Sequence, residues 1–285
     1  MDVILIFNGL GNQMSQYALY LSKKSRHQKV RCLFVNNDHN GIELNSLFGV
    51  DTHPKLLDKF LMRCYMWLIS PASPLLKRIL YRINVKVIKE FDYSYQKEVL
   101  ESSFGLVFYW GGWHHPKYFE RIEDYIREKY TFPSIFDAPS MNLLGGASQS
   151  NSIAIHFRRG DYLDKKNHNH FGKVCTDEYY NNAIHFMEEK IKNPIYYIFS
   201  DDIEWCRIFM KNKKCVFVDW NTSDDSWKDM FLMSQFKNLI IPNSTFSWWA
   251  AFLGRKDKLV CRPPYFMNHK IVPGFFLDNW VEIAN

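Results

Sequence analysis

Short apolar runs alternate with longer amphipathic stretches along most of this chain. Apolar runs bounded by turn residues predict strands, and the predicted strands are 2–7, 30–35, 85–89, 106–110, 153–157, 195–199, 215–218, 238–241 and 259–261. Amphipathic spacing predicts helices over 14–24, 55–83 with a break at 71–74, 117–129, 177–190, 203–210, 226–235 and 245–253. Strand–helix units joined by short connections predict parallel sheets with helices on both faces.

The stretch 131–151 interrupts this alternation. Two prolines and two glycines stand there among Ser, Asn and Gln, a composition typical of linkers. A chain of 285 residues also suits two domains better than one. We therefore predict an α/β protein with two domains, 1–145 and 146–285.

Composition and charge narrow the classes of partner. Hydrophobic residues make up 47% and charged residues 23% of the chain, which indicates a globular protein with sizeable cores. The net charge of +6 fits anionic small substrates or an acidic membrane surface. The chain has no arginine-rich tract and no nucleic-acid motif, so we expect no nucleic-acid partner.

The six cysteines form no C-x-x-C pair, which favours free thiols in a reducing compartment over disulfides or a zinc site. The first strand follows Met1 directly, so no signal peptide is predicted and a cytoplasmic location is expected. Prolines and basic residues interrupt the apolar stretch 60–83, which therefore does not span a bilayer. The basic, apolar piece 75–82 fits a peripheral contact with an anionic membrane, such as the cytoplasmic face of the inner membrane. An ordinary amphipathic helix is the commoner use of such a pattern.

Two adjacent arginines, Arg158 and Arg159, follow the predicted strand 153–157. Guanidinium groups bind phosphate oxygens through paired donors. Ligands of open α/β sheets bind at the carboxyl ends of strands. The pair therefore predicts a site for an anionic ligand such as a nucleotide diphosphate, with surface ion pairs to nearby acids as the alternative.

The loop Gly9-Leu10-Gly11-Asn12-Gln13 follows the first predicted strand. Glycines let the backbone approach a ligand, and the start of the next helix favours an anion. A dinucleotide fingerprint needs a third glycine where this chain has Met14, which argues against a hydride-transfer enzyme. A tight turn without a ligand remains the alternative.

Asp201 and Asp202 follow the predicted strand 195–199. Their carboxylates fit hydrogen bonds to a ribose or a guanine edge, but Asp at this position more often caps the next helix. The chain has no Asp-x-Asp, which weakens the case for a metal ion that bridges a diphosphate. Without a metal, arginines and helix N-termini must neutralise the leaving diphosphate.

The loop that follows strand 238–241 carries Asn243, Ser244 and Thr245 at the start of a predicted helix. Hydroxyl groups and free backbone N–H groups at such a start form an anion site. Plain N-capping by Asn243 or Ser244 is the alternative.

Together these segments resemble glycosyltransferase family 11, the α-1,2-fucosyltransferases, and in particular its bacterial members. The segments that carry the resemblance, in the family's order, are 9–13 with Tyr17-Ala18, 156–162, 200–202, and 229–234 running to 243–251. The resemblance implies a GT-B architecture, with two Rossmann-like domains facing across a cleft. It implies inverting, metal-independent transfer of L-fucose from GDP-β-L-fucose, without a cofactor, to the 2-hydroxyl of a terminal β-galactoside. For a bacterial member it implies synthesis of a surface glycan such as the O-antigen of lipopolysaccharide or a capsule.

The resemblance also implies roles for residues and domains. It makes 1–145 the acceptor-side domain and 146–285 the GDP-fucose-binding domain, with Arg158 on the β-phosphate. Asp161 is the candidate base, although it could instead orient Arg158, or the departing phosphate could take the proton. The predicted donor-binding residues are Gly9, Gly11, Asn12, Gln13, His156, Arg159, Asp201, Asp202, Asn243, Ser244, Thr245 and Ser247.

The segment 110–119 is similar to a family pattern but departs from it at Gly112 and His114, where Tyr and Gln are usual. If this loop touches the acceptor, the predicted acceptor residues are Trp113, His114 and His115. Two alternatives for the whole chain remain. One is a nucleotide-sugar binding protein without turnover, and the other is a related fucosyltransferase that acts on chitin oligomers or protein hydroxyls.

Overall fold

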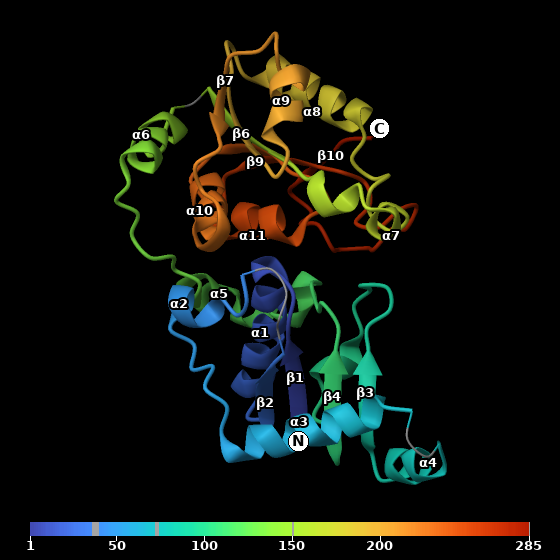
Figure 1. The fold of residues 1–285 in the computed structure, drawn as a ribbon. Coiled ribbons are helices and arrows are strands. Elements are labelled where there is room, and N and C mark those ends of the chain that lie inside the picture. Colours follow the sequence, from blue (N-terminus) through green and yellow to red (C-terminus); the bar gives the residue numbers. More distant parts are fainter. Residues whose placement is uncertain (36–39, 72–73, 150, 285) are drawn as a thin grey trace. The chain divides into compact units, whose positions relative to one another are not determined.

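The computed structural model describes residues 1–35, 40–71, 74–149 and 151–284 (Figure 1). The chain divides into two compact units, Met1–Phe132 and Pro133–Asn285. The sequence analysis set the boundary after residue 145, whereas helix α6 (Ala138–Ala147) lies wholly in the second unit. This helix forms in the predicted linker because the Asp137 carboxylate caps it and accepts a hydrogen bond from the Ser140 N–H at 2.9 Å.

The first unit holds a four-stranded parallel sheet in the order β2-β1-β4-β3. Its strands are β1 (Asp2–Ile6), β2 (Val30–Phe34), β3 (Val85–Lys89) and β4 (Leu106–Trp110). Its helices are α1 (Leu10–Ser25), α2 (Leu44–Phe48), α3 (Leu56–Ile69), α4 (Pro74–Arg82) and α5 (Glu123–Lys129), with 3₁₀ turns η1 (Lys97–Leu100), η2 (Pro116–Tyr118) and η3 (Glu120–Ile122).

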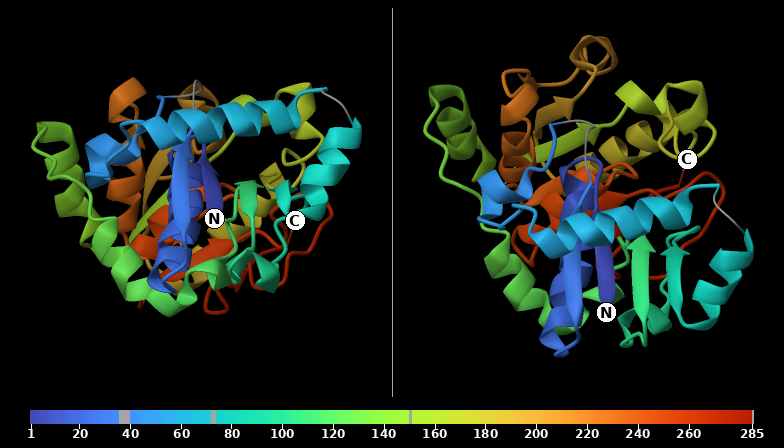
Figure 2. Two further views of the ribbon diagram at one scale, coloured as in Figure 1. Left: turned by 90° about the horizontal axis from the view of Figure 1, so that it is seen from below. Right: turned by 60° about the horizontal axis from the view of Figure 1, so that its bottom comes forward.

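Helix α3 covers one face of this sheet (Figure 2). Leu61 and Tyr65 of α3 pack against Val3 and Leu5 of β1 and against Phe108 of β4. All five residues of β1 are buried, as expected for a central strand of a parallel sheet. The core therefore fixes the positions of β1 and β4. Glycine-containing loops follow both strands, at residues 9–11 and 111–112.

The second unit holds a six-stranded sheet in the order β10-β9-β8-β5-β6-β7, in which all pairs are parallel. Its strands are β5 (Ser152–Phe157), β6 (Ile195–Ser200), β7 (Cys215–Val218), β8 (Asn238–Ile240), β9 (Leu259–Arg262) and β10 (Val281–Glu282). Besides α6, its helices are α7 (Lys165–His168), α8 (Asp177–Lys190), α9 (Ile203–Phe209), α10 (Trp227–Ser234) and α11 (Thr245–Leu253), with 3₁₀ turns η4 (Gly160–Tyr162) and η5 (Ser223–Asp225).

Each strand predicted from the pattern is present, with ends that differ by at most one residue. The α/β class with parallel sheets is therefore confirmed. The pattern missed the short β10, and it placed the start of α1 at residue 14 rather than at Leu10. Across the described parts of the chain, every helix is too short or too polar to reach from one side of a bilayer to the other.

Candidate functional site

The strand order of the second sheet determines where a ligand can bind. β5 is the first strand of this unit and lies between β6 and β8, with Phe157 beside Ser200 and Ile155 beside Ile240. The chain therefore builds the sheet in one direction through β6 and β7, and in the other through β8 and β9. Open α/β sheets bind ligands at such a switch point, outside the carboxyl ends of the strands. The loops that follow β5, β6 and β8 meet there, and these are the loops predicted to hold the donor.

Asp201, which follows β6, holds the loop that follows β5. Its Oδ1 accepts hydrogen bonds from the backbone N–H groups of Arg159 at 2.9 Å and Gly160 at 3.0 Å. Its Oδ2 lies 2.9 Å from Nη1 of Arg158. A Cβ on residue 160 would come within 2.6 Å of the same Oδ2, so a glycine is needed there. One carboxylate thus fixes both the loop and its first arginine.

Arg158 is oriented from two sides. Its Nη1 pairs with Asp201, and its Nη2 lies 2.7 Å from Oδ1 of Asp161, although this second ion pair lacks hydrogen-bond alignment. The guanidinium also lies over the ring of Tyr162, 5.6 Å from its centroid. These contacts leave Arg158 partly exposed at the carboxyl edge of the sheet, where it can meet an anion.

Arg159 points to a different partner. Its Nε donates to Oδ2 of Asp202 at 3.0 Å, and its guanidinium stacks 3.9 Å above the ring of Trp205. The other oxygen of Asp202 accepts the Trp205 N–H at 3.2 Å and so caps α9. Asp202 therefore takes the capping role that the sequence left open, and it also orients Arg159. Among the described residues, no group of three His, Cys, Asp or Glu side chains is placed to hold a metal ion.

His156 lies inside the sheet just before the arginines. Burial, and secondarily the charge of Arg158, hold the pKa of this imidazole well below its usual range. Its ring packs against Phe246 of α11, with centroids 5.9 Å apart. In the part of the chain that the structure describes, its Nδ1 makes no hydrogen bond. His156 is thus a neutral residue that links β5 to the start of α11.

Asn243 positions the loop before α11. Its Nδ2 donates to the carbonyls of Phe171 and Phe266 at 3.1 and 2.9 Å, and its Oδ1 accepts from the Cys175 thiol at 3.4 Å. Its own carbonyl accepts the Tyr162 hydroxyl at 2.9 Å, which ties this loop to η4. Since the side chain is fully engaged and buried, we expect Asn243 to shape the loop rather than to touch the donor.

The start of α11 has the features of an anion site. Ser244 is the N-cap residue, in extended conformation, and its side chain makes no capping hydrogen bond. No acidic residue lies in the first turn, where Thr245 and Ser247 stand. The first N–H groups of a helix lack carbonyl partners within that helix, and the helix dipole favours an anion there. The plain N-capping that the sequence left open is therefore not what the structure shows for Ser244.

The first unit places the other predicted donor residues at the end of β1. Gly9 is the N-cap residue of α1 and makes no side-chain capping bond, because it has no side chain. Gly11 and Asn12 lie in the first turn, which contains no acidic residue. The order β2-β1-β4 also makes this a switch point of the first sheet. This loop therefore places a second helix start, without an acidic residue, at a switch point.

Gln13 serves the architecture of this loop. Its Nε2 donates to the carbonyls of Asn8 and Gly41, both at 2.7 Å, and its Oε1 accepts the Glu43 N–H at 3.0 Å. The side chain is fully buried. Gln13 thus ties the turn after β1 to the segment before α2, and its predicted contact with the donor stays a prediction.

The predicted acceptor residues are core residues of the first unit. The Trp113 side chain is fully buried, with positive φ of 53°. His114 stacks on Tyr93 with centroids 5.5 Å apart, and burial lowers its pKa to about 3. His115 is buried, and its Nδ1 accepts the Lys117 N–H at 3.2 Å. Because all three side chains are buried, they present little exposed surface to an acceptor. Their acceptor role stays a prediction.

Sequence reasoning missed Glu90, which follows β3. Its Oε2 accepts the N–H groups of Gly112 at 2.7 Å and Trp113 at 2.8 Å, and so clamps the loop after β4. Burial raises the pKa of this carboxyl to about 7. A Cβ on Gly111 would come within 2.4 Å of the Glu90 Cβ. The only signal in the sequence was a lone acidic residue at the end of a predicted strand.

Asp229 is a second carboxyl with a raised pKa that the site prediction omitted, although it lies in one of the family segments. Burial raises its pKa to about 7, against the effect of a hydrogen bond from Nδ2 of Asn221 at 2.7 Å. It stands in the first turn of α10.

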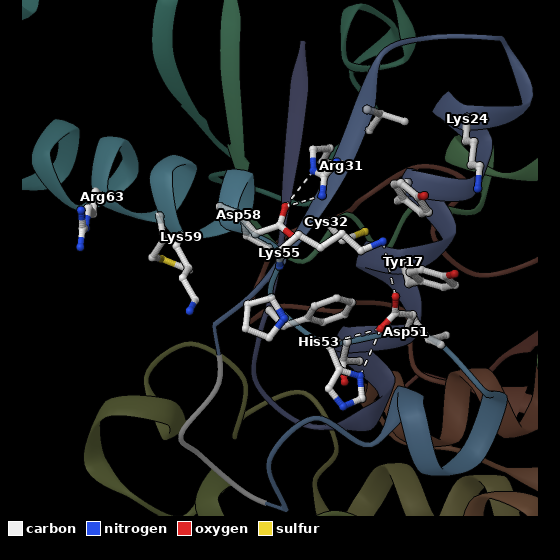
Figure 3. A pocket seen from close by; sticks show the side chains of 18 residues that line it. Tyr17, Lys24, Arg31, Cys32, Asp51, His53, Lys55, Asp58, Lys59 and Arg63 are labelled. Atoms are coloured by element: carbon white, nitrogen blue, oxygen red, sulfur yellow. Dashed lines mark hydrogen bonds and ion pairs between the residues drawn. The ribbon is translucent and has the colours of Figure 1, made fainter.

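A hollow of about 750 Å³ lies elsewhere in the first unit (Figure 3). Residues of α1, of β2, of the segment 50–55 and of α3 line it. Arg31 and Asp58 form an ion pair within it at 2.7 Å. None of the predicted site residues lines this hollow, so it and the candidate site are different places on the chain.

The sequence of this chain is similar to one family model and to three known proteins. The model described as Glycosyl transferase family 11 matches residues 66–284. Alpha-1,2-colitosyltransferase of Escherichia coli is 30% identical over 266 residues, which cover 90% of this chain and 88% of that protein. O-antigen biosynthesis glycosyltransferase WbnK of Escherichia coli is 35% identical over 136 residues, 47% of this chain and 45% of that protein. Galactoside alpha-(1,2)-fucosyltransferase 1 of Saimiri boliviensis boliviensis is 26% identical over 180 residues, 58% of this chain and 49% of that protein.

A solved structure shares the fold. The NodZ alpha-1,6-fucosyltransferase soaked with GDP-fucose superposes with a TM-score of 0.51, over 89% of this chain and 92% of that one. The sequence identity is 12%, so this likeness concerns the fold alone. With the parallel sheets of both units, it confirms the predicted GT-B class of two Rossmann-like domains.

Proposed function

The chain belongs to glycosyl transferase family 11, and from this premise we propose that it transfers L-fucose from GDP-β-L-fucose to the 2-hydroxyl of a terminal β-galactoside. The product linkage is α-1,2, with inversion at the sugar. The observation that carries the proposal is the orientation of Arg158 by Asp161 and Asp201 at the switch point of the second sheet.

The proposed donor site stabilises the leaving group. Breaking the bond between fucose and phosphate builds negative charge on the β-phosphate. Groups that bind this charge more strongly in the transition state than in the ground state accelerate the reaction. Arg158 has a guanidinium fork that suits a phosphate, and Arg159 follows it on the same loop. The N-terminus of α11, with Ser244 and Thr245, adds backbone and hydroxyl donors beside the same sheet edge.

The proposed chemistry is a single displacement. The acceptor 2-hydroxyl oxygen forms a bond to the anomeric carbon, the bond from that carbon to the β-phosphate oxygen breaks, and GDP leaves. The hydroxyl proton passes to the Asp161 carboxylate, which we assign as the base. Asp201 is a poorer candidate because both of its oxygens already accept from Arg158 or the loop backbone. A phosphate oxygen of the leaving GDP is the other possible acceptor of the proton.

We propose that the reaction needs neither a metal nor another cofactor. Asp201 and Asp202 support this, because their oxygens are engaged with Arg158, Arg159 and backbone N–H groups rather than facing a shared cation site. In this arrangement the arginines replace the charge that Mg²⁺ would supply.

A second candidate is α-1,2-colitosyl transfer, which the relative that is 30% identical over most of its length favours. The same arginine loop would serve either donor, because it faces the phosphates and not the sugar. For both candidates we propose a role in the synthesis of a bacterial surface glycan, in line with the relative described as an O-antigen enzyme.

A donor and acceptor screen in excess EDTA tests these assignments. GDP-fucose and nucleotide-linked colitose are each offered with a β-galactoside, a chitin oligomer and a hydroxyl-bearing peptide. Products are detected by mass, and the linkage is determined by NMR. Transfer of fucose to the galactoside 2-hydroxyl supports the proposal, and transfer of colitose alone supports the second candidate. Binding of GDP-fucose without any transfer would contradict both, and activity that returns only with added Mg²⁺ would contradict metal independence.

A further inference from the structure

The basic charge of this chain is concentrated in one segment of the first unit. The residues from 55 to 89 include eight Lys or Arg and one Asp, a net charge of +7, whereas the whole chain carries +6. The rest of the chain is therefore slightly acidic. The single acid, Asp58, is paired with Arg31 from β2 at 2.7 Å. This segment comprises α3, α4 and β3, so the charge gathers on one part of the fold.

The same segment exposes large apolar side chains. On α3, Leu56 is 87% and Phe60 is 59% exposed, and on α4, Ile79 is 50% and Tyr81 is 64% exposed. The buried side of α3 is a different one, because Leu61 and Tyr65 pack on the sheet. The helix is thus apolar on both sides, and only one side is covered by the protein. Exposed apolar side chains that lie together commonly mark an interaction surface.

Basic and apolar side chains alternate on the outward side of both helices. Positions 56, 60 and 63 share one face of α3 by helical spacing, and Lys59 lies next to them. Arg78 and Arg82 flank Ile79 on α4. Among the residues that the structure describes, Lys59, Arg63, Arg78 and Arg82 are exposed and form no ion pair. Their charges are therefore available to an outside partner.

Both helices lie on the outside of the first unit, α3 across one face of the sheet and α4 next to β3 (Figure 2). Lys77 of α4 donates to the Ser70 carbonyl at the end of α3, which holds the two helices together. We name the exposed residues Leu56, Lys59, Phe60, Arg63, Arg78, Ile79, Tyr81 and Arg82 the basic–apolar face.

We propose that the basic–apolar face docks the protein on an anionic lipid bilayer. A helix that lies in a membrane interface buries apolar side chains among the acyl chains, while Lys and Arg meet anionic headgroups. A second copy of the chain would bring an equally basic face against this one, and like charges across an interface disfavour association. The charge of the face therefore favours an anionic lipid surface over a second copy of the chain. The inference does not rest on the transferase activity. For the segment 75–82 it favours a membrane contact over an ordinary amphipathic helix that packs only on its own protein.

The test is co-sedimentation of the full chain with vesicles of phosphatidylcholine, alone or mixed with phosphatidylglycerol. We expect binding to the anionic vesicles that weakens as salt rises. Replacing Lys59 and Arg63 together by Ala should weaken this binding roughly 30-fold, because each basic side chain near an anionic surface contributes roughly fivefold in affinity. The matched control is Lys192→Ala with Lys211→Ala, two exposed lysines of the second unit, which removes the same charge elsewhere.

A second pair of variants tests the apolar half. Leu56→Ser with Phe60→Ser should reduce vesicle binding, whereas Phe136→Ser, at a similarly exposed position outside the basic–apolar face, should not. Thermal unfolding and fucosyl transfer to a soluble acceptor should be unchanged in all variants, since none lies in the candidate site. Equal binding of face and control variants would overturn the proposal. So would a change from dimer to monomer in the face variants, which would show that a second copy of the chain covers this surface.

Discussion

The Arg158 guanidinium is held on two sides by Asp161 and Asp201. The sequence placed arginines and aspartates at neighbouring strand ends, because parallel strands bring their carboxyl ends to one edge of a sheet. It did not predict that Asp201 would clamp the loop, since that depends on the direction of one side chain. Nor did it predict the burial of Glu90, which no pattern of neighbouring residues indicates.

Arg158→Ala should abolish transfer and leave the fold intact. Losing a charge-assisted contact to the transition state costs about 3 kcal/mol or more, a rate loss of hundreds-fold. Arg158→Lys should fail as well, because a single ammonium cannot reproduce the paired contacts of a guanidinium. The measurement is kcat with the proposed donor and acceptor, together with thermal unfolding.

Arg207→Ala is the matched control for this prediction. Arg207 pairs with Asp219 at 2.7 Å and lies over the Phe217 ring at 4.6 Å, so it has similar contacts but stands away from the switch point. Its removal should leave kcat nearly unchanged. Near-normal turnover of either Arg158 variant would show that this arginine is structural.

Asp161→Asn separates two roles. As a base, Asp161 acts only in the transition state, so kcat should fall steeply while GDP affinity stays nearly intact. As an orienter of Arg158, its loss should damage GDP affinity and kcat together, because the 2.7 Å ion pair is removed. Titration of GDP and single-turnover kinetics on the same variant distinguish these results. Little change in either quantity would eliminate both roles.

At the scale of elements, the patterns predicted α8 and α11 to the residue. Both have a Thr or Ser at the N-cap and apolar side chains at helical spacing. The pattern was wrong over 117–122, where 3₁₀ turns replace the first part of the predicted helix. There the His115 side chain accepts a hydrogen bond from the Lys117 N–H and caps a 3₁₀ turn that begins at Pro116. Hydrophobic periodicity does not reveal such local hydrogen bonds.

Gly160→Ala tests the loop as an element. The new Cβ would lie 2.6 Å from Oδ2 of Asp201, so the carboxylate must move and loosen its hold on the loop and on Arg158. Losing one such charged contact costs about 1.5–3 kcal/mol, and we expect kcat/KM to fall roughly tenfold or more. Steady-state kinetics check the loss, and circular dichroism checks that the unit still folds.

Gly145→Ala provides the control for that experiment. Gly145 lies in α6, and a Cβ there would meet no atom within 4 Å. Alanine is favoured over glycine in a helix by up to about 1 kcal/mol, so this variant should be as stable as the parent or more so, with normal kinetics. If both glycine variants behave alike, the close approach of Asp201 to the loop has no role in activity.

At the scale of the whole molecule, the alternation of strands and helices predicted two parallel-sheet units. The NodZ structure agrees with that class. The boundary was harder to place, because Pro and Gly in the stretch 131–151 suggested a linker where Asp137 caps a helix. The basic–apolar face was visible in part as the segment 75–82. The outward side of α3 could not be assigned from sequence, because that helix is apolar on two faces.

As the pH rises from about 4.5 to about 7, the parent protein should lose stability relative to the Glu90→Gln variant. The pKa of Glu90 is raised from 4.5 to about 7 in the folded protein, so the folded state keeps a proton that the unfolded state releases. The contribution of Glu90 to stability is therefore largest when its carboxyl is protonated in both states, and it is lost as the pH rises through the folded pKa. Gln keeps the acceptor for the Gly112 and Trp113 N–H groups without ionising.

Thermal unfolding followed from pH 4 to 8 measures the effect, in roughly the range where these carboxyls titrate. Asp229, whose pKa is also raised to about 7, acts in the same direction, whereas the buried His114 and His156, whose pKa values are lowered, act in the opposite one. All three remain in both proteins, so the effect of Glu90 is the difference between the parent and variant curves. Glu128→Gln, on the exposed side of α5 in the same unit, should follow the parent curve. If Glu90→Gln also follows the parent curve, then Glu90 is ionised in the folded protein, and the loop after β4 is held by a carboxylate rather than by a carboxylic acid.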